Sequence, residues 1–294
     1  MDIPWDDVRL FLAVAEAGSV SGAARKLRLG QPTVSRRLAA LEYAMGEALF
    51  RRGVSGAALT EAGERLLGPA RRMAEWAGEV GRAADTADRE PRGVIRITTM
   101  PFVAFDFLAP FAGKLLQKHP GMRVEVLSSV THLDLGRGEA DLALRSRAPT
   151  QADLTLVHTV EVENAVFVSR TLAQRLPRKP RLQDLPWIAW APPFDEVTPN
   201  PQLAAIIPGF TPVFASDQFL VQLAAAEAGV GAMVLPRLRH RFARTTSLVP
   251  LPIDLGPHQR SPLYVVCAKS ALDIPRVRRV AELLVEELER ARKD

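Results

Sequence analysis

Residues 19–42, SVSGAARKLRLGQPTVSRRLAALE, form the stretch of sequence that says most about the fold. Ser19 is a good N-cap residue, and the apolar residues that follow it recur at helical spacing. Pro32 lies where the first turn of a second helix tolerates a proline, because the missing N–H would be unpaired there anyway. The stretch therefore predicts two short helices joined by a tight turn, with Gly30 as the turn glycine. This is the layout of a helix-turn-helix DNA-binding motif.

The second predicted helix presents polar side chains beside an apolar side that contains Val34, Leu38 and Leu41. Gln pairs bidentately with adenine, Thr offers a methyl and a hydroxyl group, and Ser and Arg reach phosphates or guanine. The candidate DNA contacts of the motif are Ser21, Gln31, Pro32, Thr33, Val34, Ser35, Arg36 and Arg37. Taken alone, the stretch fits an ordinary helical hairpin with a basic, solvated face equally well.

The flanking segments favour the DNA-binding interpretation. Residues 6–17 predict a supporting first helix, and the runs FLAVAEAGSVSGAA, QPTVSRRLAALE, GEALFRR and LTEAG span about the first 65 residues. Together these runs resemble the winged helix-turn-helix of the LysR-type transcriptional regulators. The resemblance implies a wing in which Arg51 and Arg52 contact DNA. Many family members have a further basic residue where this chain has Ser55, so we expect the wing contact to depend on the two arginines.

Residues 61–88 predict a long linker helix, for which Thr60 is a natural N-cap. Its apolar stripe is narrow and needs a partner surface; it consists of Leu66, Leu67, Ala70, Met73, Ala74, Ala77, Val80 and Ala84. The resemblance implies that this helix pairs with its twin in a homodimer, and the alternative is that it packs on its own domain. Residues 89–93, REPRG, are predicted to form a hinge.

Residues 94–294 alternate short apolar runs with helical stretches, which predicts parallel sheets covered by helices. The predicted strands are 94–98, 123–127, 141–144, 164–168, 187–190, 212–215, 232–235 and 263–267. The predicted helices are 101–118, a short one near 132–138, 217–228 and 275–292. This half resembles the type 2 periplasmic-binding-protein fold that LysR-type regulators use to bind inducers. Lobe I would comprise about 94–162 and 268–294, and lobe II about 163–267.

The predicted fold class is therefore α+β and multidomain. It combines an N-terminal all-α winged helix-turn-helix domain over residues 1–60, the linker helix, and a C-terminal two-lobed α/β effector-binding domain. In such folds a ligand lies between the lobes, at the carboxyl ends of strands. The candidate effector contacts are Thr98, Thr99, Met100, Ser128, Ser129, Arg145, Phe194, Ser216 and Met233.

Each of these candidates has a structural alternative. The threonines and serines could cap strand ends, Phe194 could simply pack in a proline-stiffened loop, and Arg145 suits a lobe-bridging ion pair as well as a ligand. If the set binds a ligand, its mixture of polar, Met and Phe side chains predicts a small, partly apolar acid or carbonyl compound.

Composition sets further bounds. The formal net charge of +5 and the pI of about 9.8 agree with an anionic partner. The single cysteine, Cys267, excludes an internal disulfide and a multi-cysteine metal site. The five histidines are dispersed, phosphate-loop and nucleophile-elbow motifs are absent, and Gly229-Val230-Gly231 lacks the third glycine of a dinucleotide fingerprint. We therefore expect no catalytic residue, no metal and no cofactor.

The start of the chain, MDIPWDDV, is acidic and lacks the apolar run of a signal peptide, and the sequence contains no 18-residue apolar segment. We expect a cytoplasmic protein that does not insert into a membrane.

These patterns predict a sequence-specific transcriptional regulator whose partners are double-stranded DNA, a small-molecule effector, a homodimer that pairs into a homotetramer, and RNA polymerase. The alternative is a constitutive DNA-binding protein whose α/β half serves only oligomerisation. A third hypothesis is an enzyme with a vestigial DNA-binding motif.

Overall fold

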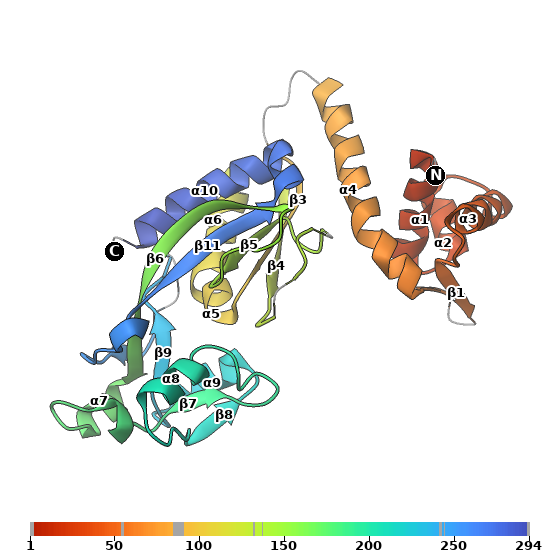
Figure 1. The fold of residues 1–294 in the computed structure, drawn as a ribbon. Helices are drawn as coiled ribbons and strands as arrows, with labels where there is room; N and C mark the ends of the chain where they lie inside the picture. The colour runs from red at the N-terminus through yellow and green to blue at the C-terminus, as the bar shows by residue number, and fades with distance from the viewer. Residues whose placement is uncertain are drawn as a thin grey trace. The chain divides into compact units, whose positions relative to one another are not determined.

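A computed structural model describes residues 3–53, 56–84, 91–131, 133–136, 138–240, 243 and 245–292 of the chain. The chain divides into two compact units (Figure 1). The first unit comprises residues 1–89 with the short segment 136–139, and the second comprises residues 90–135 and 140–294.

The first unit is built from three helices, a two-stranded hairpin and a long helix. In chain order these are α1 (Trp5–Ala17), α2 (Val20–Leu27), α3 (Gln31–Met45), β1 (Phe50–Gly53), β2 (Gly56–Leu59) and α4 (Glu61–Ala84). Its core centres on Phe11, which is fully buried and lies 5.4 Å, ring centroid to ring centroid, from Phe50. The β1–β2 hairpin, which we call the wing, therefore shares one small core with the helices.

Two hydroxyl side chains cap the helices of this unit as predicted. Ser19 Oγ accepts a hydrogen bond of 3.1 Å from the backbone N–H of Gly22 at the start of α2. Thr60 Oγ1 accepts one of 3.1 Å from Gly63 at the start of α4 and donates one of 2.6 Å to the carbonyl of Ala48. Such caps satisfy N–H groups that have no partner inside the helix.

The turn between α2 and α3 differs from the prediction in one respect. The residue in the left-handed conformation is Arg28, with φ of 55°, and it caps α2. Gly30 has φ of −69° and is the extended N-cap of α3. The turn therefore does not require the conformational freedom of this glycine.

Gly63 explains why the segment LTEAG ends in glycine. A Cβ atom at this position would lie 2.3 Å from the carbonyl oxygen of Leu49. The first turn of α4 therefore crosses the chain that leads into the wing at a distance that only glycine allows.

The second unit contains a large mixed sheet and a small one. Its strands are β3 (Gly93–Thr99), β4 (Met122–Ser128), β5 (Leu142–Arg145), β6 (Leu154–Ser169), β7 (Ile188–Trp190), β8 (Phe214–Ser216), β9 (Met233–Pro236), β10 (Leu248–Pro250) and β11 (Arg260–Ala268). The large sheet has the order β10-β6-β11-β5-β3-β4, with β9 also paired to β6. Strand β3 is parallel to β4 and β5, as the alternating pattern predicts, whereas β11 is antiparallel to β5 and β6.

Strand β6 belongs to both lobes of this unit. It pairs with β11 over residues 154–163, and then with β9 and β10 over residues 164–169. Figure 1 shows β6 and β11 as long neighbouring strands that lead from the lobe of β3, β4 and β5 towards the lobe of β7, β8 and β9. The sequence prediction found only 164–168 of β6, although the first ten residues of this strand, LTLVHTVEVE, alternate apolar with polar side chains as half-buried strands do.

Helices cover these sheets. They are α5 (Pro101–Val103), a π-helical turn (Ala104–Leu108), α6 (Ala109–Lys118), α7 (Arg170–Arg175), α8 (Asn200–Ile206), α9 (Phe219–Glu227) and α10 (Pro275–Ala291). The first three run on without interruption over the predicted helix 101–118. The predicted short helix near 132–138 is wrong where it can be compared, since residues 133–136 form a loop and turn. None of the helices among the described residues is long and apolar enough to span a membrane.

Candidate DNA-binding surface and ligand cavity

Helix α3 has a buried side and an exposed side. Val34, Leu38 and Leu41 are buried in the core of the first unit. Gln31, Pro32 and Arg36 are exposed, and Thr33 and Ser35 are half-buried beside them. The prediction that Val34 contacts DNA needs correction, because a side chain that is fully buried in this core cannot reach a base edge.

Two of the predicted arginines of α3 have different surroundings. Arg36 makes no hydrogen bond or ion pair with any residue that the structure describes, so its guanidinium group is free to bind DNA. The guanidinium of Arg37 instead binds Asp7 Oδ1 of α1, with Nε at 2.7 Å and Nη2 at 2.5 Å. Arg37 therefore fastens α3 to α1 and orients the exposed side.

The remaining predicted DNA contacts lie in α2 and the wing. Ser21 is half-buried in the first turn of α2. Arg51 is exposed on β1, where its Nη2 donates a 3.5 Å hydrogen bond to the carbonyl of Leu59. The side chain of Arg52 and the whole of Ser55 lie outside the described residues.

Tyr43 was not predicted, yet it lies on the exposed side of α3. Its side chain is 90% exposed, the highest value among the large apolar residues described. It follows Arg36 by seven residues, which is two helical turns or about 10 Å along the same face. The motif ends before this position, so helical phase was the only signal in the sequence.

The apolar stripe of α4 is partly packed on its own unit and partly exposed. Leu66, Leu67, Ala70 and Ala74 pack against the core of the first unit. Met73 and Trp76 are exposed. Only these two large apolar side chains remain uncovered among the described residues of the helix.

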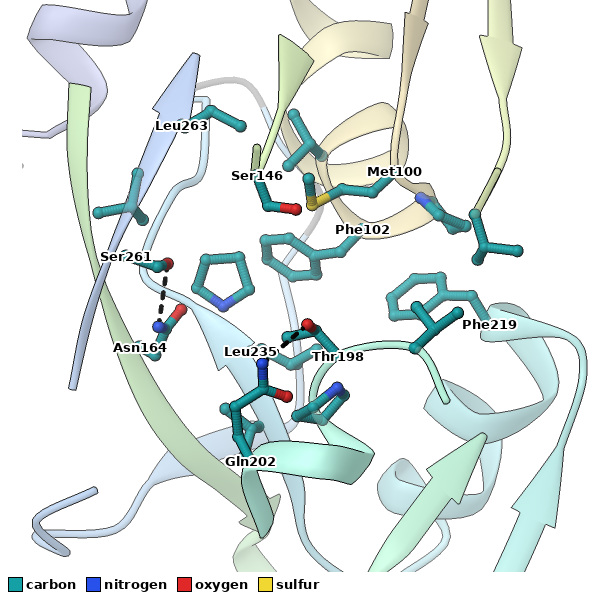
Figure 2. A pocket seen from close by; sticks show the side chains of 18 of the residues that line it. Met100, Phe102, Ser146, Asn164, Thr198, Gln202, Phe219, Leu235, Ser261 and Leu263 are labelled. Atoms are coloured by element: carbon teal, nitrogen blue, oxygen red, sulfur yellow. Dashed lines mark hydrogen bonds between the residues drawn. The ribbon is translucent and has the colours of Figure 1, made fainter. Parts of the chain in front are cut away.

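The second unit contains a cavity of about 640 Å³ whose lining comes from both lobes (Figure 2). This volume is typical of sites for small organic ligands. Six of the predicted effector contacts line it: Thr98, Thr99, Met100, Ser129, Arg145 and Met233. Ser128, Phe194 and Ser216 are not among the lining residues. Phe194 packs on Trp190, and Ser216 Oγ accepts a hydrogen bond from the backbone of Gln218.

The two threonines both use their hydroxyl protons within the sheet. Thr98 Oγ1 donates to the carbonyl of Leu127 at 3.0 Å, and Thr99 Oγ1 donates to that of Leu144 at 3.1 Å. These bonds join β3 to its two neighbours, as the strand-end capping alternative proposed. The hydroxyl oxygens keep lone pairs, so a ligand would meet acceptors here instead of donors.

Positive charge outweighs negative charge along the cavity. Arg145 is 7% exposed, and its Nη2 donates a 2.7 Å hydrogen bond to the carbonyl of Leu133. Burial lowers the pKa of Arg145, and the nearby charge of Asp134 opposes this shift. Arg147 and Arg260 also line the cavity, whereas Glu196 is the carboxylate among the lining residues. An anion is therefore favoured over a cation as ligand.

Much of the lining was not predicted from the sequence. Figure 2 shows Phe102 and Ser146, from one lobe, and Thr198, Gln202 and Phe219, from the other, around the cavity. The residues of the second lobe lie about a hundred positions further along the chain and belong to no motif. Only the folded sheet brings them opposite β3.

The run Gly229-Val230-Gly231 allows a close approach of two backbone segments and does not form a phosphate loop. A Cβ atom at Gly231 would lie 2.4 Å from the carbonyl oxygen of Pro186, so two chain segments cross here. Cys267 is fully buried, and burial raises the pKa of its thiol to about 11. Among the described residues there is no group of three His, Cys, Asp or Glu side chains that could hold a metal ion.

Comparison with known families accounts for both units. Residues 5–64 match the bacterial regulatory helix-turn-helix proteins of the lysR family, and residues 88–289 match the LysR substrate binding domain. The chain therefore belongs to the LysR family of bacterial transcriptional regulators. The predicted family, fold class and function as a DNA-binding regulator are confirmed.

Individual relatives agree. The chain is 30% identical over 232 residues to the Mau operon transcriptional activator of Paracoccus denitrificans, which is 79% of each chain. Full-length OxyR from Pseudomonas aeruginosa has the same fold, with a TM-score of 0.71 and 17% identity over 98% of this chain and 95% of that one. LysG from Corynebacterium glutamicum, solved with its effector Arg bound, has a TM-score of 0.62 and 18% identity over 97% of this chain and 99% of that one.

Proposed function

We propose that this chain reads its operator with the exposed side of α3 and changes its regulation when a small organic anion binds in the cavity between the lobes. The observation that carries the proposal is the presence of both features in one chain. One unit has an exposed, polar helix face with an Arg36 that pairs with no described residue, and the other has an arginine-lined cavity of ligand size.

In the DNA-binding unit, Gln31, Ser35 and Arg36 of α3 contact bases or phosphates in the major groove, with Thr33 and Pro32 beside them. Ser21 and the wing arginines, Arg51 and Arg52, contact the sugar-phosphate backbone. Arg37 acts indirectly, through its ion pair with Asp7. Phosphate contacts make the affinity for DNA fall as salt rises.

In the sensor, the carboxylate or other anionic group of the effector lies near Arg145 and Arg147, at the carboxyl ends of the strands of lobe I. The apolar part contacts Met100, Phe102 and Met233. The protein acts by binding this compound, not by converting it. LysG, which binds arginine as its effector, shows that a structure of this fold accepts a small charged molecule.

The assembly is a homodimer that pairs into a homotetramer and meets RNA polymerase on DNA in the cytoplasm. Met73 and Trp76 of α4 support the dimer, because exposed large apolar side chains on a helix mark a contact surface. In this assignment residues 1–60 bind DNA, 61–88 dimerise, 89–93 form the hinge, and 94–294 sense the effector.

A reporter gene behind the DNA upstream of this chain's own gene tests the proposal. The wild-type chain should change reporter output when one of a panel of small organic acids is supplied. Gln31→Ala/Ser35→Ala should abolish regulation altogether, whereas Arg147→Ala should keep DNA binding and need about five-fold more acid for the same response. Normal regulation by Gln31→Ala/Ser35→Ala would refute the assignment of α3 as the DNA-recognition helix. A wild-type chain whose reporter output no acid changes would favour the constitutive alternative.

A further inference from the structure

One buried side-chain oxygen in the cavity has no hydrogen-bond partner among the described residues. Gln202 lies in α8 and lines the cavity from lobe II (Figure 2). Its Nε2 donates a 3.0 Å hydrogen bond to Thr198 Oγ1. Its Oε1 is buried, and no described residue donates a hydrogen bond to it. Buried amide oxygens are nearly always paired in folded proteins, so this one requires an explanation.

The position of Gln202 is fixed by its surroundings. Asn200, two residues earlier, accepts a 3.1 Å hydrogen bond from the backbone N–H of Trp190 and donates a 2.9 Å one to its carbonyl. These bonds hold the start of α8 against β7. The bond to Thr198 then holds the amide itself, so Gln202 Oε1 cannot easily turn to another partner.

The described side chains around Gln202 do not supply the missing donor. Leu203, Ile206 and Leu235 are apolar neighbours in the lining. The amide of Asn164, which also lines the cavity, already donates to the carbonyl of His258 at 3.0 Å and to Ser261 Oγ at 3.1 Å. A bound molecule is therefore the natural source of the donor.

We infer that the effector carries a hydroxyl or amino group that donates a hydrogen bond to Gln202 Oε1, on the side of the cavity opposite its anionic group. This inference rests on the proposed function, because it places the anion near Arg145 and Arg147 in lobe I. The ligand class is thus a hydroxy or amino acid whose donor and carboxylate are separated by an apolar middle. Such a molecule makes a polar contact with each lobe at once.

Calorimetric titration of the full-length chain with two matched pairs of acids tests this inference. The pairs are benzoate with 4-hydroxybenzoate, and hexanoate with 6-hydroxyhexanoate. In at least one pair, the hydroxyl-bearing acid should bind the wild-type chain about 10-fold more tightly or better, because a buried acceptor left unpaired disfavours the parent acid. Gln202→Met should remove this difference and keep the affinity for the parent acid.

Two further variants guard the test. Gln151→Met, at an exposed position outside the cavity, should discriminate as the wild-type chain does. Gln202→Glu keeps the hydrogen-bond acceptor and adds a negative charge, so it should bind 6-aminohexanoate more tightly than 6-hydroxyhexanoate. This variant tests the inference if Gln202→Met does not fold.

The outcomes separate the two proposals. If both members of each pair bind wild type equally, Gln202 is satisfied by water alone and this inference is wrong, while the acid sensor stands. The inference is also overturned if Gln202→Met still prefers the hydroxyl-bearing acid to its parent acid. It is overturned as well if Gln202→Glu does not prefer 6-aminohexanoate to 6-hydroxyhexanoate. If no acid binds, both this inference and the proposed effector class are wrong.

Discussion

The two units of this chain carry their proposed functional residues in opposite ways. The first unit presents them outward, on the exposed side of α3, within a stretch of about twenty residues. The second unit encloses them in a cavity whose lining runs from Thr98 to Leu263 in sequence. A local, outward-facing site leaves a motif in the sequence, and an enclosed site assembled from distant strands does not.

The largest effect should come from the cores that support the two sites. Phe11→Ala should destabilise the first unit by about 3–5 kcal/mol, since it removes a fully buried ring from a small core. Phe107→Ala, also at a fully buried ring, should do the same to the second unit. Hydrogen exchange, followed segment by segment, measures each unit separately. If either variant loosens both units equally, the two units do not fold independently.

Acid should act on the second unit through Glu287. Burial raises the pKa of Glu287, but its hydrogen bond and ion pair with Lys114 and the charges of Arg290 and His240 outweigh burial, so the net pKa is lowered. A depressed pKa stabilises the fold above the ordinary value of 4.5, and this stabilisation is lost as the pH falls through the folded-state pKa.

Glu287→Gln should therefore cost roughly 1–3 kcal/mol at neutral pH and flatten the loss of stability below pH 4.5. Thermal unfolding of the second unit between pH 7 and pH 3 measures both effects. An unchanged pH profile in the variant would show that Glu287 does not cause the acid sensitivity of the second unit.

Gly63 and Gly113 form a matched pair. Gly63→Ala should destabilise the first unit by about 1–3 kcal/mol, because the new methyl group meets the carbonyl of Leu49. Gly113→Ala in α6 meets nothing within 4 Å and should stabilise the second unit by about 0.5–1 kcal/mol. Chemical unfolding of both variants gives the two signs. Equal signs would mean that the crossing of α4 and the wing is not as close as described.

Arg36→Ala should weaken operator binding by about 1–2 kcal/mol, roughly 10- to 30-fold, and leave acid binding unchanged. Arg123→Ala removes the same charge from an exposed position of β4 in the other unit and should have little effect. Fluorescence anisotropy with labelled DNA gives both affinities. A similar loss in both variants would mean that only overall charge matters.

Arg147→Ala should have the smallest free-energy effect, about 1 kcal/mol in the binding of an anionic ligand, because Arg147 is exposed and screened by solvent. Calorimetric titration with 4-hydroxybenzoate measures it, and Arg178→Ala, an exposed arginine outside the cavity lining, is the control. A smaller loss of affinity in Arg178→Ala than in Arg147→Ala supports the assignment of Arg147 to the anion site. An equal loss of affinity in both variants contradicts it.

The first unit could be predicted from sequence nearly element by element. Ser19, Thr60, Pro32 and the apolar spacing fixed the helix starts and faces, because caps and periodicity are local properties. The two errors differ in kind. Val34 is buried in helical phase with Leu38 and Leu41, so periodicity already argued against counting it as a DNA contact. Arg37 is paired with Asp7, thirty residues away, and that fact cannot be read from a helix taken alone.

The second unit could be predicted only in outline. Its strands followed from apolar runs, and the rule that ligands lie at strand ends led to six residues that line the cavity. Trp190, Gln202 and Phe219 were missed because no periodicity marks them. Their role depends on how β6 and β11 carry the chain from one lobe to the other and back.

The most direct test of the central claim is the affinity of the full-length chain for its own upstream DNA and for a scrambled duplex, measured in the same salt. The account predicts that wild type prefers its own DNA by about 1,000-fold or more. Gln31→Ala/Ser35→Ala should lose most of that preference while the first unit keeps its unfolding temperature. A double variant that binds the upstream DNA with wild-type affinity and selectivity would contradict the assignment of α3 as the reader.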